Sequence, residues 1–519
     1  MNKINIITGG ALLILGLTFG YGVARKMPES HIGEMQEHGG DMVTSDGSTH
    51  TFDSTDAEEE GYWYSRYNLG NLSMRSGMGD IIKPDKAHVL KAMQAVDADF
   101  NMEQFKSGNK TYGDGDHVTP PQNVAPIKTV YKSGDPHFIT KFNPADFGTQ
   151  RWDRSKMDKT LTGLANGFTI LKEVEWARQF HVDEHFGTPK SNFGAYWRFV
   201  GMMMTMNAKM QAKSFMENMA AYDMSNGGNA TMLMAMSDLA DFLSVEKLPH
   251  SDVPNRYKDT KMAPMMKQTT DMLFTKVVAE NPTSIRELAR NIQALVWYAA
   301  KTDNIANKKQ AAKKITTLAK SLAKHNPVNA TARAWYLRGL VEAHRTLGVT
   351  TGDILPVAAA FLADFNNTTG GFNSQSEYTI DDIGTIIGAL NALRTFETAD
   401  VDADRVNEVF KIFHEIMMNK NGMILSTPPI SVAKSKFEYE GEPTTYFRYG
   451  PSQPVPPMAG GKFGVAPVFA SKMSRVGNTW KVTDARFDTA GAMHTSNEMI
   501  WLHYDEINGF PTIDLSDVL

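Results

Sequence analysis

The feature that most constrains the fold is a pair of amphipathic helices that recurs in the second half of this 519-residue chain. Apolar residues at spacings of three and four predict a helix from Ile285, opened by a Ser284–Glu287 capping box, and a second helix ending near Asn326. Similar pairs begin near Asn329 and near Thr379. A chain that repeats such a pair can bury each apolar face only against the neighbouring pair.

The repeat has a regular length. Leu295, Leu340 and Leu390 occupy equivalent places in the first helix of each pair, at intervals of 45 and 50 residues. The same periodicity predicts a helix from Asp158 onward, where Leu161, Leu164, Phe168 and Leu171 share one face. Further helices are predicted over residues 193–222, 230–245 and 263–279. We therefore predict a mainly α fold of stacked helical hairpins.

The last hundred residues have a different pattern. Two segments of strand character flank Val476-Gly477-Asn478 and predict a small C-terminal β-hairpin. Thr489 to Tyr504 then predicts one closing helix. Ahead of the hairpin, the prolines between Pro428 and Pro457 exclude regular structure, because proline removes a backbone donor.

The N-terminus predicts a transmembrane helix. Ile4 to Val23 holds twenty uncharged residues, the length of helix that crosses a bilayer. From Met27 to Glu60 there are ten acidic residues and no Lys or Arg, so no basic stretch retains this part in the cytoplasm. We expect an uncleaved signal anchor, single-pass in a bacterial inner membrane, with the main domain in the periplasm or outside the cell. A cleaved signal peptide is the alternative, and a buried core helix comes third.

These patterns divide the chain into five parts. They are a signal anchor over 1–26, an acidic disordered tether over 27–60, an irregular N-terminal wrap over 61–154 with a short helix around Pro84–Phe100, a helical-hairpin domain over 155–423, and a segment over 424–519 that adds the Pro-rich stretch, the β-hairpin and the closing helix to the same domain.

Composition excludes several kinds of function. The chain has no cysteine, so it forms no disulfide, no thiolate metal site and no cysteine nucleophile. A net charge of −5 gives no basic surplus for nucleic acid, and the lysines between Lys308 and Lys324 are expected on a solvated helix face. The sequence also lacks a P-loop, a dinucleotide-binding glycine motif and a G-x-S-x-G elbow.

The helix pairs, with a Gly-Gly-aromatic turn such as Gly370-Gly371-Phe372 between helices, resemble the α/α toroids. That group includes six-hairpin glycosidases, polysaccharide lyases and terpenoid-cyclase-like proteins. The resemblance is architectural and covers roughly residues 155–505. It implies that loops at one end of an inner helix ring form a funnel for ligand, and that an extracytoplasmic member acts on glycan. An open α-solenoid is the alternative architecture.

Two polar clusters would lie at such a funnel. One surrounds the start of the helix after Thr379, and the other runs from Asp484 into the closing helix. Paired carboxylates could do acid/base work on a glycosidic bond, although acidic residues also favour helix N-termini for electrostatic reasons. The candidate catalytic residues are Glu377, Asp381, Asp382, Asp488, His494 and Glu498, and the candidate substrate-binding residues are Tyr378, Arg486, Asn497 and Trp501.

Two further patterns suggest a metal. His181, Glu184 and His185 form an H-x-x-E-H motif that on a helix could hold zinc, although a polar helix end has the same composition. In the tail, imidazoles and thioethers alternate at spacings of four, three and four, a combination that suits copper. Those tail residues are His31, Met35, His38 and Met42.

Methionine is unusually dense in one part of the chain. Eleven methionines fall between Met202 and Met236, where we expect core packing, with a thioether metal path as the alternative.

Three functional hypotheses follow from these patterns. The first is a membrane-anchored protein that binds or processes glycan in a toroid funnel near residues 377–382 and 484–498. The second is a periplasmic protein that handles copper or zinc, or supports a redox system, without catalysis. The third is an interaction scaffold for a protein partner.

Overall fold

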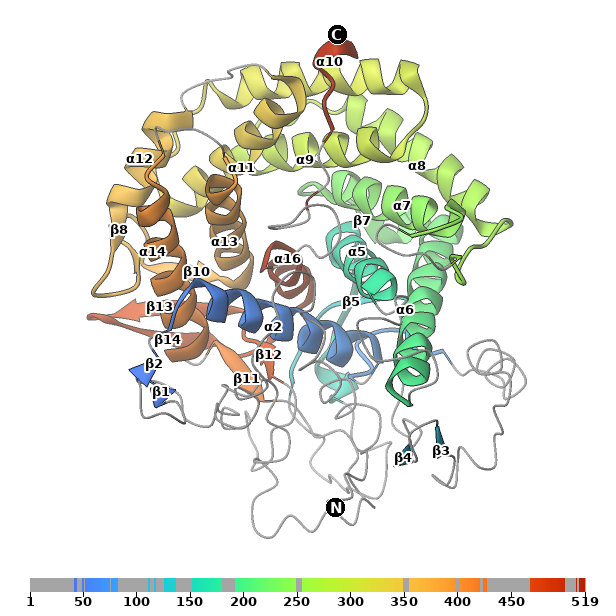
Figure 1. Cartoon of the computed structure of the whole chain (residues 1–519), viewed down its shortest axis with the longest axis horizontal. Helices are drawn as coiled ribbons and strands as arrows, with labels where there is room; N and C mark the ends of the chain where they lie inside the picture. Colours follow the sequence, from blue (N-terminus) through green and yellow to red (C-terminus); the bar gives the residue numbers. More distant parts are fainter. Residues whose placement is uncertain are drawn as a thin grey trace.

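The structure is a computed structural model in which most of the described residues are helical (Figure 1). It describes residues 42–43, 49–50, 52–74, 76–82, 111–112, 116–117, 126–136, 152–179, 192–248, 254–348, 354–396, 401–420, 423–426, 467–499, 510 and 513–518. Among these residues, no helix combines the length and the apolar character needed to cross a bilayer. The predicted anchor over Ile4 to Val23 and the predicted helix around Pro84–Phe100 lie outside the described residues.

Six helices pack on one another in a closed circuit of contacts. Each one contacts the next along the chain, and the last, α16, contacts the first, α5. Figure 1 shows them around the centre of the molecule. They are α5 (Gly163–Gln179), α7 (Gly228–Ser244), α9 (Ile285–Lys301), α11 (Ala330–Leu347), α13 (Ile380–Arg394) and α16 (Thr489–Met499).

A second set of helices packs on the outside of this circuit. Each outer helix packs mainly on one inner helix, so that the elements form pairs (Figure 1). In the order of their inner partners they are α6 (Asn192–Glu217), α8 (Met262–Ala279), α10 (Ile305–Leu322), α12 (Ile354–Asp364), α14 (Ala403–His414) and α2 (Ser54–Met74). The helices predicted from periodicity between residues 193 and 419 are confirmed, with ends that differ by a few residues.

Contacts between side chains show that the inner helices run in the same direction. Gly227, before α7, lies against Arg290 near the start of α9, and Lys301 at the end of α9 pairs with Asp241 near the end of α7. At the C-terminal end of α11, Arg345 donates to the carbonyl of Ala392 near the end of α13. The circuit therefore has one end built from helix N-termini and one built from helix C-termini.

Short strands cover the N-terminal end of the circuit. One mixed sheet has the order β15-β5-β6-β7, in which β6 and β7 are parallel and the other pairs antiparallel. Three of these strands run directly or by a short turn into inner helices, because β6 precedes α5, β7 precedes α7 and β15 precedes α16. The strands are β5 (Tyr131–Gly134), β6 (Asp158–Thr162), β7 (Tyr222–Asp223) and β15 (Phe487–Asp488).

The predicted C-terminal β-hairpin is confirmed, and it gains a third strand. Val476 and Thr479 pair around a turn in which Gly477 has φ of 64°, a conformation that glycine adopts without strain. The resulting sheet has the order β10-β13-β14 and joins residues almost a hundred positions apart. The strands are β10 (Glu377–Thr379), β13 (Lys472–Val476) and β14 (Thr479–Asp484), and α13 begins directly after β10.

The remaining strands form short pairs. They join β1 (Met42–Val43) to β2 (Thr49–His50), β3 (Thr111–Tyr112) to β4 (Asp116–His117), β8 (Phe365–Asn366) to β9 (Gly371–Phe372), and β11 (Ile424–Ser426) to β12 (Pro467–Phe469). The predicted Gly370-Gly371-Phe372 turn therefore forms one side of a small hairpin. A Cβ on Gly371 would lie 2.4 Å from the Trp480 ring, so this position needs glycine.

Two predicted boundaries are wrong. The helix α2 begins at Ser54, within the segment predicted as a disordered tether up to Glu60, and strands β1 and β2 also fall in that segment. Acidic residues in the first turns stabilise a helix N-terminus, which explains why an acidic stretch is helical here. Residues from Asp158 to Thr162 form β6 rather than the first turn of a helix, because they pair with β5 and β7. Helix α5 starts only at Gly163.

Candidate functional site

Five inner-helix side chains from four helices meet at the N-terminal end of the circuit. Arg286 and Arg290 come from the first two turns of α9, Asp381 from the first turn of α13, and His494 from the second turn of α16. Trp335, from the second turn of α11, lies flat against His494, with ring centroids 5.3 Å apart and an interplanar angle of 5°. We call these five residues the N-terminal cluster.

Asp381 lies at the centre of the N-terminal cluster. Its two carboxylate oxygens lie 3.1 Å from Nη2 of Arg286 and 3.0 Å from Nδ1 of His494, and Arg290 Nη2 is 3.8 Å away. Burial opposes the charge on Asp381, but Arg286, His494 and Arg290 together hold the pKa of this carboxyl well below its usual range. Asp381 is therefore ionised at any physiological pH.

Arg290 is a fully buried cation at this end. Its guanidinium lies 4.7 Å from the ring centroid of Trp335 and 5.1 Å from that of Phe168. Burial, with the nearby charge of Arg286, lowers its pKa to about 9. A Cβ on Gly227 would lie 2.8 Å from Cδ of Arg290, so a glycine with φ of 89° leaves room for this side chain.

Asp488 reaches the same end from strand β15. Its Oδ2 accepts a hydrogen bond from the backbone N–H of Gly491, which makes it a cap for α16. Burial and then the charge of Asp381 raise the pKa of Asp488 to about 6. The two carboxyls are close enough to affect one another, and their pKa values move in opposite directions. One is a stable anion and the other an acid that holds its proton in mildly acidic solution.

Beneath the N-terminal cluster, ion pairs continue along the interior of the circuit. His494 Nε2 lies 3.7 Å from Oε1 of Glu498, and Glu498 Oε2 accepts a hydrogen bond of 3.2 Å from Nε of Arg338. Arg338 also pairs with Glu342. Burial opposes the charge of Glu498, whereas Arg338 and His494 lower its pKa. Arg338 thus lies between two carboxylates, so each of these three buried ions has a neighbour of opposite charge.

Gly388 on α13 leaves the space that the Glu498 side chain occupies. A Cβ on Gly388 would lie 2.0 Å from Oε2 of Glu498, and one on Gly384, a turn earlier, would lie 2.4 Å from Oγ1 of Thr495. The two glycines therefore let α13 and α16 approach closely, which brings Asp381 and His494 into contact. Spacing of glycines by four residues is visible in the sequence, but not which helix they face.

The structure brings together four of the six predicted catalytic residues: Asp381, Asp488, His494 and Glu498. Asp382, next to Asp381, forms a capping box with Thr379 at the start of α13, and its Oδ2 accepts a 2.8 Å hydrogen bond from the Thr379 backbone. Burial raises the pKa of Asp382. Glu377 lies on the exposed side of β10 and pairs with Lys472 at 2.7 Å.

The predicted substrate-binding residues have other contacts. Tyr378 is buried, and its hydroxyl accepts a hydrogen bond from the backbone N–H of Phe372. Arg486 is exposed and donates to Asp484, whose pKa it lowers to about 2. Asn497 is buried and donates to the carbonyl of Phe168 across the contact between α16 and α5. Trp501 lies outside the described residues.

The predicted metal ligands lie almost entirely outside the described residues. This holds for His31, Met35, His38, His181, Glu184 and His185, whereas Met42 belongs to strand β1. Within the described ranges, no group of three or more His, Asp or Glu side chains is arranged to hold a metal ion. Several of the methionines on α6 and α7, such as Met204 and Met236, are buried in the core, which supports the packing interpretation.

Three members of the N-terminal cluster were missed by sequence analysis: Arg286, Arg290 and Trp335. Their one local signal is the spacing of Arg286 and Arg290, which places both on the same face of α9. That the face points into the circuit rather than to solvent depends on packing of α9 between α7 and α11.

Comparison with known protein families, with curated proteins and with solved structures found no match.

Proposed function

We propose that the described helices form an α/α toroid with six inner helices. Three observations support this proposal: the inner helices contact one another in a closed circuit, they run in the same direction, and each has an outer helix packed against it. An open solenoid would leave its first and last repeats without mutual contacts. Here α16 and α5 share both a ring contact, between His494 and Phe168, and a hydrogen bond.

We further propose that the N-terminal end of this toroid binds and cleaves a glycan. The observation that carries the proposal is the pair Asp381 and Asp488, whose pKa values are moved in opposite directions at one place. Hydrolysis of a glycosidic bond needs a protonated carboxyl to donate to the departing oxygen and an ionised carboxylate to stabilise positive charge on the sugar ring. Asp488 fits the first role and Asp381 the second.

In this mechanism Asp488 gives its proton to the glycosidic oxygen as the bond to the anomeric carbon breaks. Water adds to that carbon, and its proton restores the Asp488 carboxyl. Asp381 stays ionised because Arg286 and His494 hold it. His494 and Glu498 are positioning residues, since they act through Asp381 and the ion pairs below it.

The test replaces Asp488 by asparagine. Asp488→Asn should lower the release of reducing ends from a panel of purified polysaccharides by at least ~100-fold, the usual size of a general-acid contribution. For the unaltered protein, activity should fall as pH rises through about 6, because the acid form of Asp488 is lost above its pKa. Asp484→Asn is the matched control, since Asp484 lies four residues earlier and pairs with Arg486.

Each outcome of this test has a distinct meaning. Full activity in Asp488→Asn would contradict the assignment of the acid. Glycan binding without release of reducing ends would indicate that the protein binds glycan but does not cleave it. If no polysaccharide binds, the glycan proposal fails, and the alternatives are copper binding by the tail, zinc binding by His181, Glu184 and His185, and a scaffold role.

We also propose that the chain is anchored in a bacterial inner membrane through Ile4 to Val23, with the toroid in the periplasm or outside the cell. Support comes from the length and uncharged character of that segment and from the acidic stretch that follows it.

A further inference from the structure

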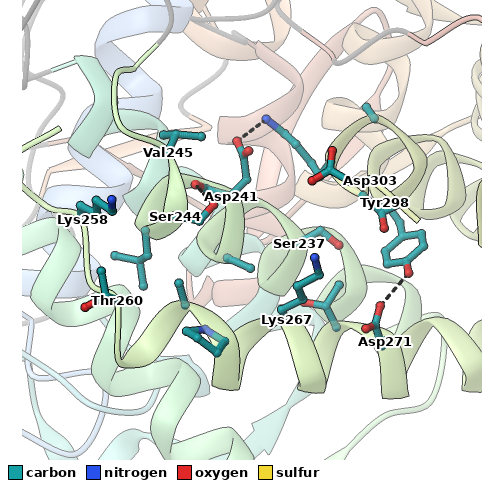
Figure 2. Close-up of a pocket in the computed structure, with 18 residues that line it drawn as sticks. Ser237, Asp241, Ser244, Val245, Lys258, Thr260, Lys267, Asp271, Tyr298 and Asp303 are labelled. Atoms are coloured by element: carbon teal, nitrogen blue, oxygen red, sulfur yellow. Dashed lines mark hydrogen bonds and ion pairs between the residues drawn. The ribbon is translucent and has the colours of Figure 1, made fainter. Parts of the chain in front are cut away.

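A cleft lies at the C-terminal end of the inner helices, at the opposite end of α9 from Arg286 (Figure 2). Its volume is ≈ 620 Å³, within the range of sites that bind small molecules. It is bounded by the last turns of α7 and α9, by the first half of α8 and by the loop that joins α7 to α8. Its charged lining residues are Asp241, Lys258, Lys267, Asp271, Lys301 and Asp303.

The walls of the cleft are held in place by interactions among these residues. Lys301 Nζ donates to Oδ2 of Asp241 at 2.8 Å, and the Tyr298 hydroxyl donates to Oδ1 of Asp271 at 2.7 Å (Figure 2). The first contact ties α9 to α7, and the second ties α9 to α8. Groups that are already paired in this way shape the cleft, and they are poorly suited to bind a charged ligand.

Two charged lining residues of opposite sign take no part in these interactions. Lys267, on α8, and Asp303, just after α9, are both exposed, and neither has an ion pair with another described residue. In Figure 2 the Lys267 side chain rises from α8 toward Ser237, on the side of the cleft where Asp303 lies. The cleft therefore offers one ammonium and one carboxylate to a ligand.

The helix ends reinforce this polarity. The C-cap residue Thr302 of α9 lines the cleft beside Asp303, so the negative end of the α9 dipole faces the cleft there, and the C-cap residue Val245 of α7 also lines the cleft. Helix α8 runs the other way and contributes Ala263 and Pro264 from its positive first turn, together with Lys267. The α8 wall thus favours an anionic group of a ligand, and the end of α9 favours a cationic group.

We propose that this cleft binds a small zwitterion of the amino-acid type, either a free amino acid or a peptide of two or three residues. The ligand carboxylate pairs with Lys267 near the start of α8, and the ligand ammonium pairs with Asp303 at the C-terminal end of α9. An aliphatic side chain packs on Leu243, Val245 and Ala263, the apolar part of the lining. The site is separate from the N-terminal cluster and does not depend on the proposed glycan activity.

The test measures heat of binding by the full chain to leucine and to the dipeptide alanyl-leucine, each also with its amine acetylated or its carboxylate amidated. Binding should be lost or weakened at least about tenfold by either modification, as expected when a charge-assisted hydrogen bond is removed. Lys267→Gln should weaken binding of the unmodified probes to a similar extent and should remove the preference for a free carboxylate. Asp303→Asn should do the same for the free amine.

Two exposed positions outside the cleft provide matched controls, Lys313→Gln on α10 and Asp404→Asn on α14, and both should bind as the unaltered chain does. Binding of leucine alone identifies a free amino acid, and binding of the dipeptide alone identifies a peptide; either supports the proposal. No heat with any probe at millimolar concentration, equal binding of the blocked probes, or unchanged binding in both cleft variants would overturn it. These outcomes are independent of the polysaccharide assay.

Discussion

At the residue scale, the most informative feature is the set of buried ionisable groups. Lys172 and Glu175, a turn apart on α5, are fully buried and pair with each other, and burial lowers the pKa of Lys172 despite this partner. Arg338 has two carboxylate partners, Glu342 and Glu498, which raise its pKa against the effect of burial. A buried ion pair costs desolvation and is strongly destabilising when one partner is lost. Loss of either partner of such a pair is therefore expected to destabilise the helical core.

Glu173 is different, because its neighbours are neutral. Burial raises its pKa well above the usual value, although Gln211 and Asn207 donate toward it. In the folded protein the carboxyl keeps its proton well above pH 4.5, whereas in the unfolded chain it loses the proton near that pH. The unfolded state therefore binds fewer protons, and the free energy of unfolding falls as pH rises from about 4.5 toward the folded pKa.

Glu173→Gln should remove this pH dependence, since the amide fills the same space without titrating. The variant and the unaltered protein should have similar melting temperatures at pH 4, and the variant should melt at the higher temperature at pH 8. Glu377→Gln is the control, because Glu377 is exposed and Lys472 lowers its pKa. Equal melting temperatures for Glu173→Gln and the unaltered chain at pH 8 would show that Glu173 is not protonated in the fold.

At the scale of elements, most of the helices follow from their own sequences. Helix α9 has its cap at Ser284, which accepts from the Glu287 N–H, and α13 has the Thr379 and Asp382 capping box. Both starts are recognisable without any tertiary contact. The strands are different, because β10 pairs with β13 and β15 pairs with β5 across long separations in sequence. Strands β10 and β15 have only three and two residues, which leaves too little pattern for a local prediction.

The contact between α16 and α5 closes the circuit of inner helices. A substitution of Asn497 tests how much this contact contributes to stability. Its Nδ2 donates to the Phe168 carbonyl on α5 at 3.0 Å and to the Met493 carbonyl within α16 at 2.7 Å. Asn497→Ala should lower the free energy of unfolding by roughly 1–3 kcal/mol, the range for a buried hydrogen bond lost between elements.

Ser496→Ala provides the comparison, because the neighbouring Ser496 hydroxyl donates only within α16, to the carbonyl of Ala492 at 2.8 Å. We expect a smaller loss of stability there, since alanine favours helix and no contact with α5 is removed. Denaturant titration of the two variants measures and compares their free energies of unfolding. An Asn497→Ala variant no less stable than Ser496→Ala would argue against a closed ring.

At the scale of the whole molecule, the two ends of the helix circuit have different chemistry. The N-terminal end carries Asp381 and Asp488 under a cover of strands, and the C-terminal end carries the cleft with Lys267 and Asp303. Phe510, from the end of the chain, packs on Trp297 with ring centroids 5.2 Å apart and lies against Arg338. The C-terminal tail thus contacts the interior ion pairs from the side opposite the N-terminal cluster.

The proposed membrane anchor is a prediction about the whole chain. The full-length protein should sediment with membranes and resist extraction by alkaline carbonate, and its main domain should be accessible to protease added to spheroplasts. Leu13→Arg with Ile14→Arg should release it, because arginine near a bilayer centre costs ~2.5–3.5 kcal/mol per residue. Sedimentation with the soluble fraction before any substitution would contradict the anchor.

The sequence by itself determined the helices, their pairing into hairpins and the C-terminal β-hairpin, because periodicity, caps and turn residues act over a few positions. It also pointed to Asp381, Asp488, His494 and Glu498, since polar groups at the start of a helix or on one helix face are visible locally. Only the tertiary structure decided that these four converge, that Arg286, Arg290 and Trp335 join them, and that Glu377 and Arg486 pair with other surface groups. The direction of a helix face and the burial of a charge depend on contacts between residues far apart in the chain, such as Arg338 with Glu498, which are 160 positions apart, and no local pattern encodes them.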